Sequence, residues 1–240
     1  DGTNNKSKIG ANTTIAVSMA SLKAAAAANK TPLWEYLNSS SEKKLPLPEI
    51  QIIGGGAHAK GSIPIQDFMI IPNGAPDFHT ALHWVFKIYK LAGEKLFSEN
   101  KLYGVADEGG YWPYFNDTTS VLDFLVKVIE DAGFHPYREI SLSLDIAANN
   151  FKFNKTYIMS NKKNILFSSD DLYDYLLKLI KSYPIISIED PFAEEDIEYF
   201  KKLKENSPSY LQIVGDDLVV TNTKLIKKAY KKNAINSILI

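Results

Sequence analysis

Three short apolar runs in this sequence each end in a carboxylate, and helix-like sequence lies between them. The runs end at Asp145, Glu189 and Asp216. Each run predicts a buried strand, and strands that alternate with helices predict βαβ units and a parallel sheet. In a parallel α/β barrel the C-terminal ends of the strands share one rim, so the three acidic side chains are expected together there. Carboxylates are hard oxygen ligands that suit Mg²⁺, so the sequence predicts a magnesium site at this rim.

The three acids also have a less specific interpretation. Each could be a helix N-cap or a surface acid in the loop that follows its strand. We favour a shared site because all three acids directly follow an apolar run.

The composition excludes several classes of protein and site. The 240 residues are 45% hydrophobic and 23% charged, which is ordinary for a globular protein with a core. A formal net charge of −1 gives no indication of a nucleic-acid partner or an anionic membrane surface. The absence of cysteine excludes disulfides, thiolate metal sites and a cysteine nucleophile, and it fits a reducing compartment. No apolar run approaches the ~20 residues that a transmembrane helix needs.

The chain is expected to divide into a helical part, residues 1–44, and an α/β part, residues 45–240. Residues 12–28 are rich in Ala, Val, Met and Leu, and they predict a well-buried helix with Asn12 as its N-cap. A second short helix is expected over residues 33–37. The polar stretch 38–44 predicts a linker.

The second part is expected to contain six strands separated mainly by helices. A closed barrel of this type needs eight strands, so the sequence predicts an incomplete barrel. The expected strands are residues 49–53, 67–72, 142–145, 185–189, 211–216 and 236–240, and the expected helices are 76–98, 118–132, 169–182, 193–205 and 222–232. Candidate N-caps are Thr118 or Thr119, Ser169 or Asp170, and Thr221 or Asn222.

Two loops carry further candidate residues. In Asp107-Glu-Gly-Gly110 the glycines allow close backbone approach to a ligand, and a desolvated Glu108 could stay protonated near neutral pH and act as a general acid. The alternative is an ordinary acidic turn. The second loop is a flexible glycine run, residues 54–56, before His58, and it predicts a contact with substrate. The alternative there is a structural or exposed histidine.

Together these motifs resemble the enolase family over the whole length of the chain. The matching stretches are Asp1-Gly-Thr-Asn-Asn-Lys-Ser-Lys-Ile-Gly-Ala-Asn12, Leu45-Pro-Leu-Pro48, Gly55-Gly-Ala-His58, Gln66-Asp-Phe-Met69, Asp107-Glu-Gly-Gly110, Leu144-Asp-Ile-Ala147, Ser187-Ile-Glu-Asp-Pro191 and Gly215-Asp-Asp-Leu-Val-Val-Thr-Asn222. The resemblance implies an enolase-type (β/α)8 barrel preceded by the helical end of an N-terminal capping domain. It also implies one antiparallel strand near the start of the barrel.

The resemblance further implies a glycolytic lyase that interconverts 2-phosphoglycerate and phosphoenolpyruvate with Mg²⁺. Asp145, Glu189 and Asp216 would bind the Mg²⁺ that holds the substrate carboxylate, and Glu108 would be the acid that helps the 3-hydroxyl leave. Removal of a proton next to a carboxylate creates a doubly charged enediolate-like species. A divalent metal stabilises that species, and a base must take the proton.

The same resemblance assigns roles to further residues, and it shows where this sequence departs from the family pattern. His58 would lie in a mobile loop near the substrate, and Asp67 would occupy the position of an active-site carboxylate that is usually Glu. A side chain shorter by one methylene can misplace a hydrogen bond by ~1 Å, which is enough to lower a rate by ~10²-fold. Gly54 replaces an Asn, and Asn149-Asn150 replace the usual Ser-Glu.

The resemblance places the catalytic lysine, which acts as the base, one residue after Ile240. We therefore expect residues 1–240 to be inactive alone. The resemblance also implies a homodimer for the full-length protein and a cytoplasmic location, with a secondary cell-surface location as in some enolases. Two alternatives stay open. One is a degenerate or truncated enolase-like protein with a binding role, and the other is a member of the wider superfamily that acts on a non-phosphorylated acid.

Overall fold

The computed structural model describes residues 2–3, 5–38, 42–59, 63–160 and 165–240. The chain separates into two compact units, which meet in the sequence between Leu45 and Pro46. Residues 39–41 of the predicted linker lie outside the described residues. No helix in the described ranges combines the length and the apolar character that a membrane span requires.

The first unit contains the helices α1 (Ala11–Ala28) and α2 (Leu33–Leu37), close to the predicted ranges. Two details of the prediction were wrong. Ala26 is the single buried residue of α1, because the neighbour of this 18-residue helix within the unit is the five-residue α2, which is too short to cover it. The N-cap is Gly10, while Asn12 lies inside the first turn, where its Oδ1 accepts a hydrogen bond from the N–H of Thr13 at 2.9 Å.

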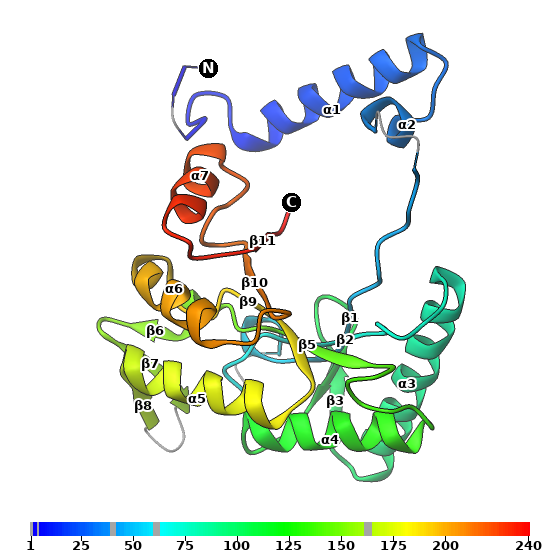
Figure 1. The fold of residues 1–240 in the computed structure, drawn as a ribbon, viewed down its shortest axis with the longest axis vertical. Coiled ribbons are helices and arrows are strands. Elements are labelled where there is room, and N and C mark those ends of the chain that lie inside the picture. The colour runs from blue at the N-terminus through cyan, green and yellow to red at the C-terminus, as the bar shows by residue number, and fades with distance from the viewer. Residues whose placement is uncertain (1, 4, 39–41, 60–62, 161–164) are drawn as a thin grey trace. The chain divides into compact units, whose positions relative to one another are not determined.

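The second unit is built on a sheet of eight strands in the described part of the chain (Figure 1). The strands are β1 (Ile50–Gly54), β2 (Asp67–Ile71), β3 (Leu102–Val105), β4 (Tyr111–Pro113), β5 (Ser141–Asp145), β9 (Ile185–Glu189), β10 (Gln212–Gly215) and β11 (Ser237–Ile238). Their order is β11-β10-β9-β5-β2-β1-β4-β3, so β3 and β11 are outer strands and the sheet does not close within the described residues.

The six predicted strands are all present in this sheet, although β11 is shorter than expected. Strands β5, β9, β10 and β11 are parallel, which is the arrangement that gathers strand C-termini at one edge. Strand β2 is antiparallel to both β1 and β5, as the resemblance implies. The antiparallel hairpin of β3 and β4 was not predicted. Its turn is the 107–110 loop.

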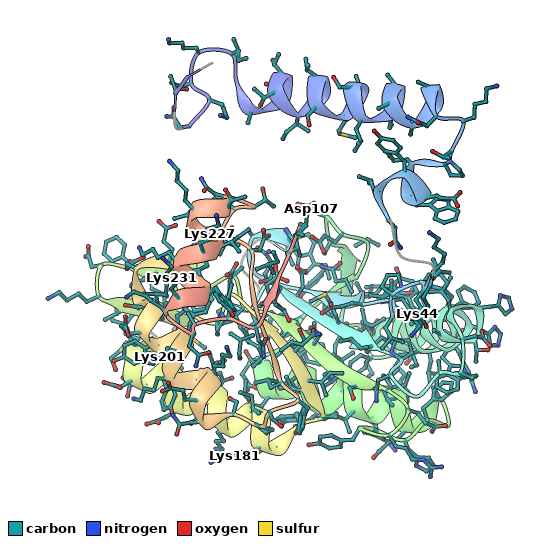
Figure 2. The ribbon with its side chains drawn as sticks, turned by 45° about the horizontal axis from the view of Figure 1, so that its top comes forward. Lys44, Asp107, Lys181, Lys201, Lys227 and Lys231 are labelled. Atoms are coloured by element: carbon teal, nitrogen blue, oxygen red, sulfur yellow. The ribbon has the colours of Figure 1, made fainter. Side chains whose placement is uncertain are left out.

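Five helices surround the sheet (Figure 1). They are α3 (Phe78–Ser98), α4 (Thr118–Asp131), α5 (Ser169–Ser182), α6 (Ile197–Asn206) and α7 (Thr223–Lys231). Helix α6 starts later than predicted because residues Glu194–Asp196 form a 3-10 turn first. Figure 2 shows Lys181, Lys201, Lys227 and Lys231 on the outer sides of α5, α6 and α7, which is where solvated lysines belong.

The predicted N-caps of two of these helices were wrong by one residue. Asp117 and Ser168 cap α4 and α5, each one residue before the predicted pair, and their side chains accept N–H groups of the first turn. Asn222 caps α7, as one of the two predicted alternatives. The correction has a physical cause, because a cap side chain must lie before the first helical residue to reach the N–H groups two or three positions on.

The segment between β5 and α5 is a short excursion of the chain. It contains the short 3-10 helix Ala148–Phe151 and a second, antiparallel sheet of three strands, β6 (Lys152–Phe153), β7 (Thr156–Ser160) and β8 (Ile165–Phe167). Residues 161–164 lie outside the described residues. The described part of the excursion follows shortly after Asp145, at the edge that carries the strand-end acids.

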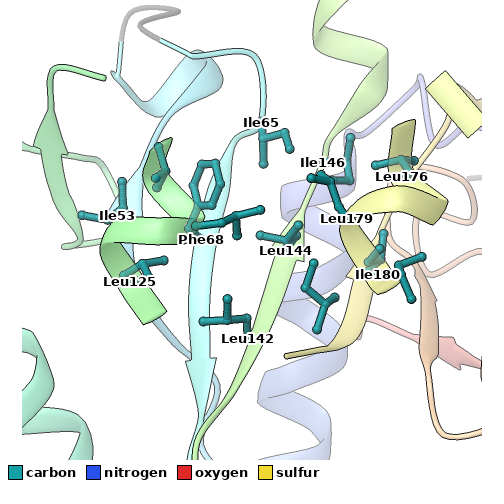
Figure 3. Close-up of a cluster of buried hydrophobic side chains, with 14 of the residues drawn as sticks. Ile53, Ile65, Phe68, Leu125, Leu142, Leu144, Ile146, Leu176, Leu179 and Ile180 are labelled. Atoms are coloured by element: carbon teal, nitrogen blue, oxygen red, sulfur yellow. The ribbon is translucent and has the colours of Figure 1, made fainter. Parts of the chain in front are cut away.

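The core lies between the sheet and its helices (Figure 3). Phe68 of β2 and Leu144 of β5 have no exposed surface, and Leu125 of α4 packs into the same cluster from the helical layer. These side chains alternate along their strands with Asp67 and Asp145 at the strand ends. Full burial of the apolar neighbours fixes the backbone from which the acids project.

Candidate active site

Asp145, Glu189 and Asp216 lie at the C-terminal ends of three neighbouring parallel strands. Asp145 is the last residue of β5, Glu189 is the last residue of β9, and the two are partners in the sheet register. Asp216 follows the last residue of β10, whose Val214 pairs with Glu189. The strand-end pattern in the sequence thus corresponds to one edge of the folded sheet.

The three carboxyl groups at this edge all have raised pKa values. Burial, then the charges of Asp67 and Asp190, raises the pKa of Asp145 to about 7. Burial, then the charge of Asp145, raises the pKa of Glu189 to about 9. The pKa of Asp216 is also raised, first by burial. In the described residues, no lysine or arginine forms an ion pair with any of these three acids.

Asp145 is held in place by a chain of side-chain amides. Its Oδ2 accepts a hydrogen bond from Nε2 of Gln66 at 2.8 Å, and its Oδ1 accepts one from the N–H of Ala147 at 3.0 Å. The Oε1 of Gln66 in turn accepts a hydrogen bond from Nδ2 of Asn150 at 3.0 Å. Asn150, one of the departures from the family pattern, therefore supports the orientation of a candidate metal ligand.

Asp190 organises the loop that carries Asp216, and the sequence analysis missed it. It is 2% exposed, and its carboxylate accepts the N–H of Asp217 at 2.6 Å, with weaker contacts to the N–H groups of Asp216 and Leu218. Its φ of 38° is left-handed, which is uncommon for a residue with a side chain. Burial raises its pKa to about 6. The sequence feature that could have indicated Asp190 is its position as a second acid directly after Glu189.

A second group of candidate residues, His58, Asp67 and Glu108, lies on other elements. Their ligand atoms lie within 4.8 Å of one another, and among the described residues no other three His, Asp or Glu side chains meet that criterion. The ligand atoms of Asp145, Glu189 and Asp216 are therefore farther apart than these. The structure brings together the three residues that the resemblance places near the substrate.

Electrostatics in this second group suit proton transfer. Burial, then the charge of Asp67, raises the pKa of Glu108, while His58 opposes the rise. Burial alone would lower the pKa of His58, but its hydrogen bond to Asp67 and the nearby carboxylates produce a net rise. The Nδ1 of His58 lies 3.2 Å from Oδ1 of Asp67. A carboxyl group with a raised pKa stays protonated over more of the neutral range, as a general acid requires.

The glycines before His58 are closely packed. Residues 54–56 are buried, and His58 lies in the 3-10 helix Gly56–Ala59. A Cβ atom on Gly54 would lie 2.3 Å from Cβ of Ala106. Gly54 therefore allows β1 to pack closely against Ala106, whereas Gly55 and Gly56 pack closely against residues 63–66.

Glu189 is reachable from solvent. It lines a pocket of about 510 Å³ together with Glu49, Gln212, Val214 and residues 237–240. Glu189 therefore borders open volume on the β9–β10–β11 side of the sheet.

Two family models match the chain, and together they cover nearly all of its length. The model described as the enolase N-terminal domain matches residues 1–37, and the enolase C-terminal TIM barrel domain matches residues 42–240. The chain belongs to the enolase family. This confirms the family resemblance, and it confirms the predicted fold class, an α/β enolase-type barrel that is incomplete in this chain.

Curated enolases align with the whole chain. The enolase of Ehrlichia ruminantium (strain Welgevonden) is 43% identical over 244 residues, and that of Ehrlichia chaffeensis (strain Arkansas) is 42% identical over 240 residues. The enolase of Ehrlichia canis (strain Jake) is 40% identical over 240 residues. Each alignment covers 100% of this chain and 56% of the relative, so the chain spans just over half the length of these enolases.

Proposed function

We propose that residues 1–240 form the metal-binding and acid-bearing part of an enolase that interconverts 2-phosphoglycerate and phosphoenolpyruvate with Mg²⁺. The observation that carries this proposal is the alignment of Asp145, Glu189 and Asp216 along one edge of the sheet. Asp67, which pairs with Asp145 across β2 and β5, connects that edge to the group that contains Glu108. A metal site and an acid site are therefore adjacent.

The strand-end acids fit Mg²⁺ by the chemistry of their donor atoms. They offer carboxylate oxygens, which hard divalent cations prefer, and Mg²⁺ is usually held by one or two carboxylates together with water and substrate oxygens. Their raised pKa values indicate that the site favours added positive charge. Bound Mg²⁺ would stabilise negative charge on the substrate carboxylate by acting as a Lewis acid.

Glu108 is proposed to donate a proton to the oxygen of the departing 3-hydroxyl. Burial and the nearby Asp67 favour its protonated form. His58 and Asp67 are proposed to bind the substrate beside it, because their polar atoms converge with the carboxyl group of Glu108 within 4.8 Å.

The reaction also needs a base that removes the proton next to the substrate carboxylate. In the part of the chain that the structure describes, no lysine is hydrogen-bonded or ion-paired to either group of site residues. We therefore propose that residues 1–240 alone do not turn over substrate and that activity belongs to a longer protein that includes them. We further propose for that protein a glycolytic role, a cytoplasmic location and a homodimeric state, with residues 1–44 as the end of the capping domain.

Phosphoenolpyruvate absorbance tests this proposal directly. The longest natural polypeptide that includes this chain should form phosphoenolpyruvate from 2-phosphoglycerate in the presence of Mg²⁺, and residues 1–240 alone should not. Glu108→Gln should abolish turnover but retain Mg²⁺ binding, while the control Glu130→Gln, on the outside of α4, should retain both.

Three outcomes would count against the proposal. Unchanged turnover in Glu108→Gln would remove the acid role, and rapid turnover by residues 1–240 would show that the chain supplies its own base. Metal binding without turnover in the longer polypeptide would favour a binding protein over an enzyme.

A further inference from the structure

Gln51 is a buried polar side chain that the proposed function has not used. It lies in β1 and is 6% exposed. Its Oε1 accepts a hydrogen bond from the N–H of Gly110 at 2.6 Å, and its Nε2 donates to Oδ1 of Asp67. The amide orientation follows from the partners, because a backbone N–H can only donate and so must face the oxygen. One carboxamide thus joins the 107–110 loop to Asp67.

Two glycines leave the space that this carboxamide occupies. A Cβ atom on Gly110 would lie 2.6 Å from Oε1 of Gln51 and 2.8 Å from its Cδ. A Cβ atom on Gly54 would lie 3.3 Å from Nε2 of the same side chain. No ordinary side chain fits at Gly110 without displacing Gln51. The close packing of the Gln51 carboxamide therefore depends on glycine at both positions 54 and 110.

The hydrogen bond from Gln51 to Asp67 also indicates which atom donates in the neighbouring pair of His58 and Asp67. Oδ1 of Asp67 receives the N–H of Gln51 and lies 3.2 Å from Nδ1 of His58. An oxygen between two nitrogen donors acts as an acceptor, so Nδ1 of His58 carries its proton toward Asp67. The Nε2 of His58 is then the ring atom left to face a substrate.

A second anchor holds the loop from the helical layer. The hydroxyl of Tyr89 on α3 donates a hydrogen bond to the carbonyl of Gly109 at 2.8 Å. The two residues that follow Glu108 are thus tied to α3 and to β1. Of these two anchors, Gln51 is the one that also contacts the Asp67 carboxylate.

We infer that Gln51 is a positioning residue that holds the loop bearing Glu108 in register with Asp67 and His58. Its catalytic consequence rests on the proposed function, whereas the hydrogen bonds themselves do not. Gln51, a polar side chain in an otherwise apolar strand, thus connects Asp67 to a loop whose Gly110 lies 59 residues from Gln51 in the sequence.

Two substitutions separate the two hydrogen bonds. Gln51→Leu keeps similar bulk and removes both bonds, whereas Gln51→Glu keeps an acceptor for the N–H of Gly110 but turns a carboxyl oxygen toward Asp67. Ser141→Ala is the control, because Ser141 is buried in the same sheet at the opposite end of β5. Each variant is made in the longest natural polypeptide that includes this chain. Hydrogen exchange of the segment 106–113, kcat and KM for 2-phosphoglycerate are measured.

In Gln51→Leu, exchange in the segment 106–113 should accelerate about tenfold, because a net hydrogen bond of ordinary strength is lost. In Gln51→Glu that segment should stay protected. In both variants kcat should fall about 10²-fold while KM changes little, because Gln51→Leu misplaces the acid and Gln51→Glu displaces the Asp67 carboxylate that the amide N–H holds. Ser141→Ala should change neither quantity.

Unchanged exchange in Gln51→Leu would overturn the inference, and so would a kcat equal to that of the unsubstituted protein in both variants. If Gln51→Leu does not fold, Gln51→Glu still tests the kinetic part, because it is nearly isosteric. If the unsubstituted protein forms no phosphoenolpyruvate, the proposed function fails, and the exchange measurement alone decides whether Gln51 holds the loop.

Discussion

Asp145 and Glu189 are register partners at the ends of the adjacent parallel strands β5 and β9. Two carboxyl groups in such positions repel each other when both are ionised, and burial adds to the cost of ionisation. Burial is the first cause of the rise of their pKa values to about 7 and about 9. We therefore expect this sheet edge to be more stable with a bound cation than without one, and that difference can be measured.

Replacement of the Glu189 carboxyl group should stabilise the metal-free chain. The Glu189 side chain accepts no hydrogen bond in the described residues, so Glu189→Gln loses no observed side-chain bond. Because the pKa of Glu189 is raised to about 9, the folded chain at pH 8 bears the cost of keeping this carboxyl group protonated, and the amide removes that cost. We expect the free energy of unfolding without metal to rise at pH 8 by on the order of 1–3 kcal/mol. The rise in Tm on addition of Mg²⁺ should be lost. Urea denaturation and thermal scans measure both quantities, with Glu130→Gln as control.

A decrease in the stability of metal-free Glu189→Gln would contradict the charge argument. A normal Mg²⁺-dependent rise in Tm in that variant would remove Glu189 from the metal site.

The loop after β10 should depend on Asp190. Asp190→Ala leaves the N–H groups of Asp216, Asp217 and Leu218 without their acceptor. Hydrogen bonds to a charged group contribute more than neutral ones, so we expect a loss of about 2–3 kcal/mol in the free energy of unfolding. Mg²⁺ binding should weaken as well, because Asp216 is no longer oriented.

Asp174→Ala is the matched control for that experiment. Asp174 is an exposed acid on α5, and such substitutions usually change stability by less than about 0.5 kcal/mol. Equal stability in the two variants would show that Asp190 does not support the loop.

A polar network centred on Asp196 should make stability depend on acid pH. Asp196 Oδ2 accepts hydrogen bonds from Nζ of Lys152 at 2.8 Å, from the buried hydroxyl of Tyr157 at 2.5 Å and from Ser169 at 2.9 Å. Burial alone would raise the pKa of Asp196, but Lys152 and the two hydroxyl groups produce a net decrease below 3.8. A lowered pKa in the folded state stabilises the fold above about pH 4, and this contribution is lost as pH falls through the folded-state pKa.

Asp196→Asn should therefore be less stable than the unsubstituted chain at pH 7, by about 1–2 kcal/mol. The difference should shrink toward zero between about pH 4 and pH 2, as followed by denaturation at each pH. Asp174→Asn should show no such convergence. A constant difference across the range would show that charge at Asp196 contributes nothing.

The strands that carry the site could be predicted from the sequence because each is an apolar run with an acid at its end. Asp145 and Glu189 were placed on the correct strands by that pattern alone. The hairpin of β3 and β4 was missed because its strands have four and three residues and are only partly buried, so they show no clear alternation. The 107–110 loop was recognised as a loop, but its contact with β1 was not.

The features that could not be predicted from the sequence depend on tertiary contacts. Gln51 and Asp190 work through partners 59 and 27 residues away, and no local pattern indicates such contacts. The glycines of residues 54–56 suggested a loop, and the sequence did not indicate that Gly54 lies so close to Ala106 that a Cβ atom would not fit. The apolar composition of α1 predicted burial, but composition does not say what will cover a helix.

The central claim is that the acids at the ends of β5, β9 and β10 form one divalent-cation site. Calorimetric titration with Mg²⁺ of residues 1–240 and of the longest natural polypeptide that includes them tests it most directly, in parallel with Glu189→Gln and Asp216→Asn. We predict a saturable binding isotherm that is lost or weakened at least tenfold in both variants, and retained in Glu130→Gln. Binding of equal strength in the unsubstituted protein, Glu189→Gln and Asp216→Asn, or no binding by the unsubstituted protein, would contradict the account.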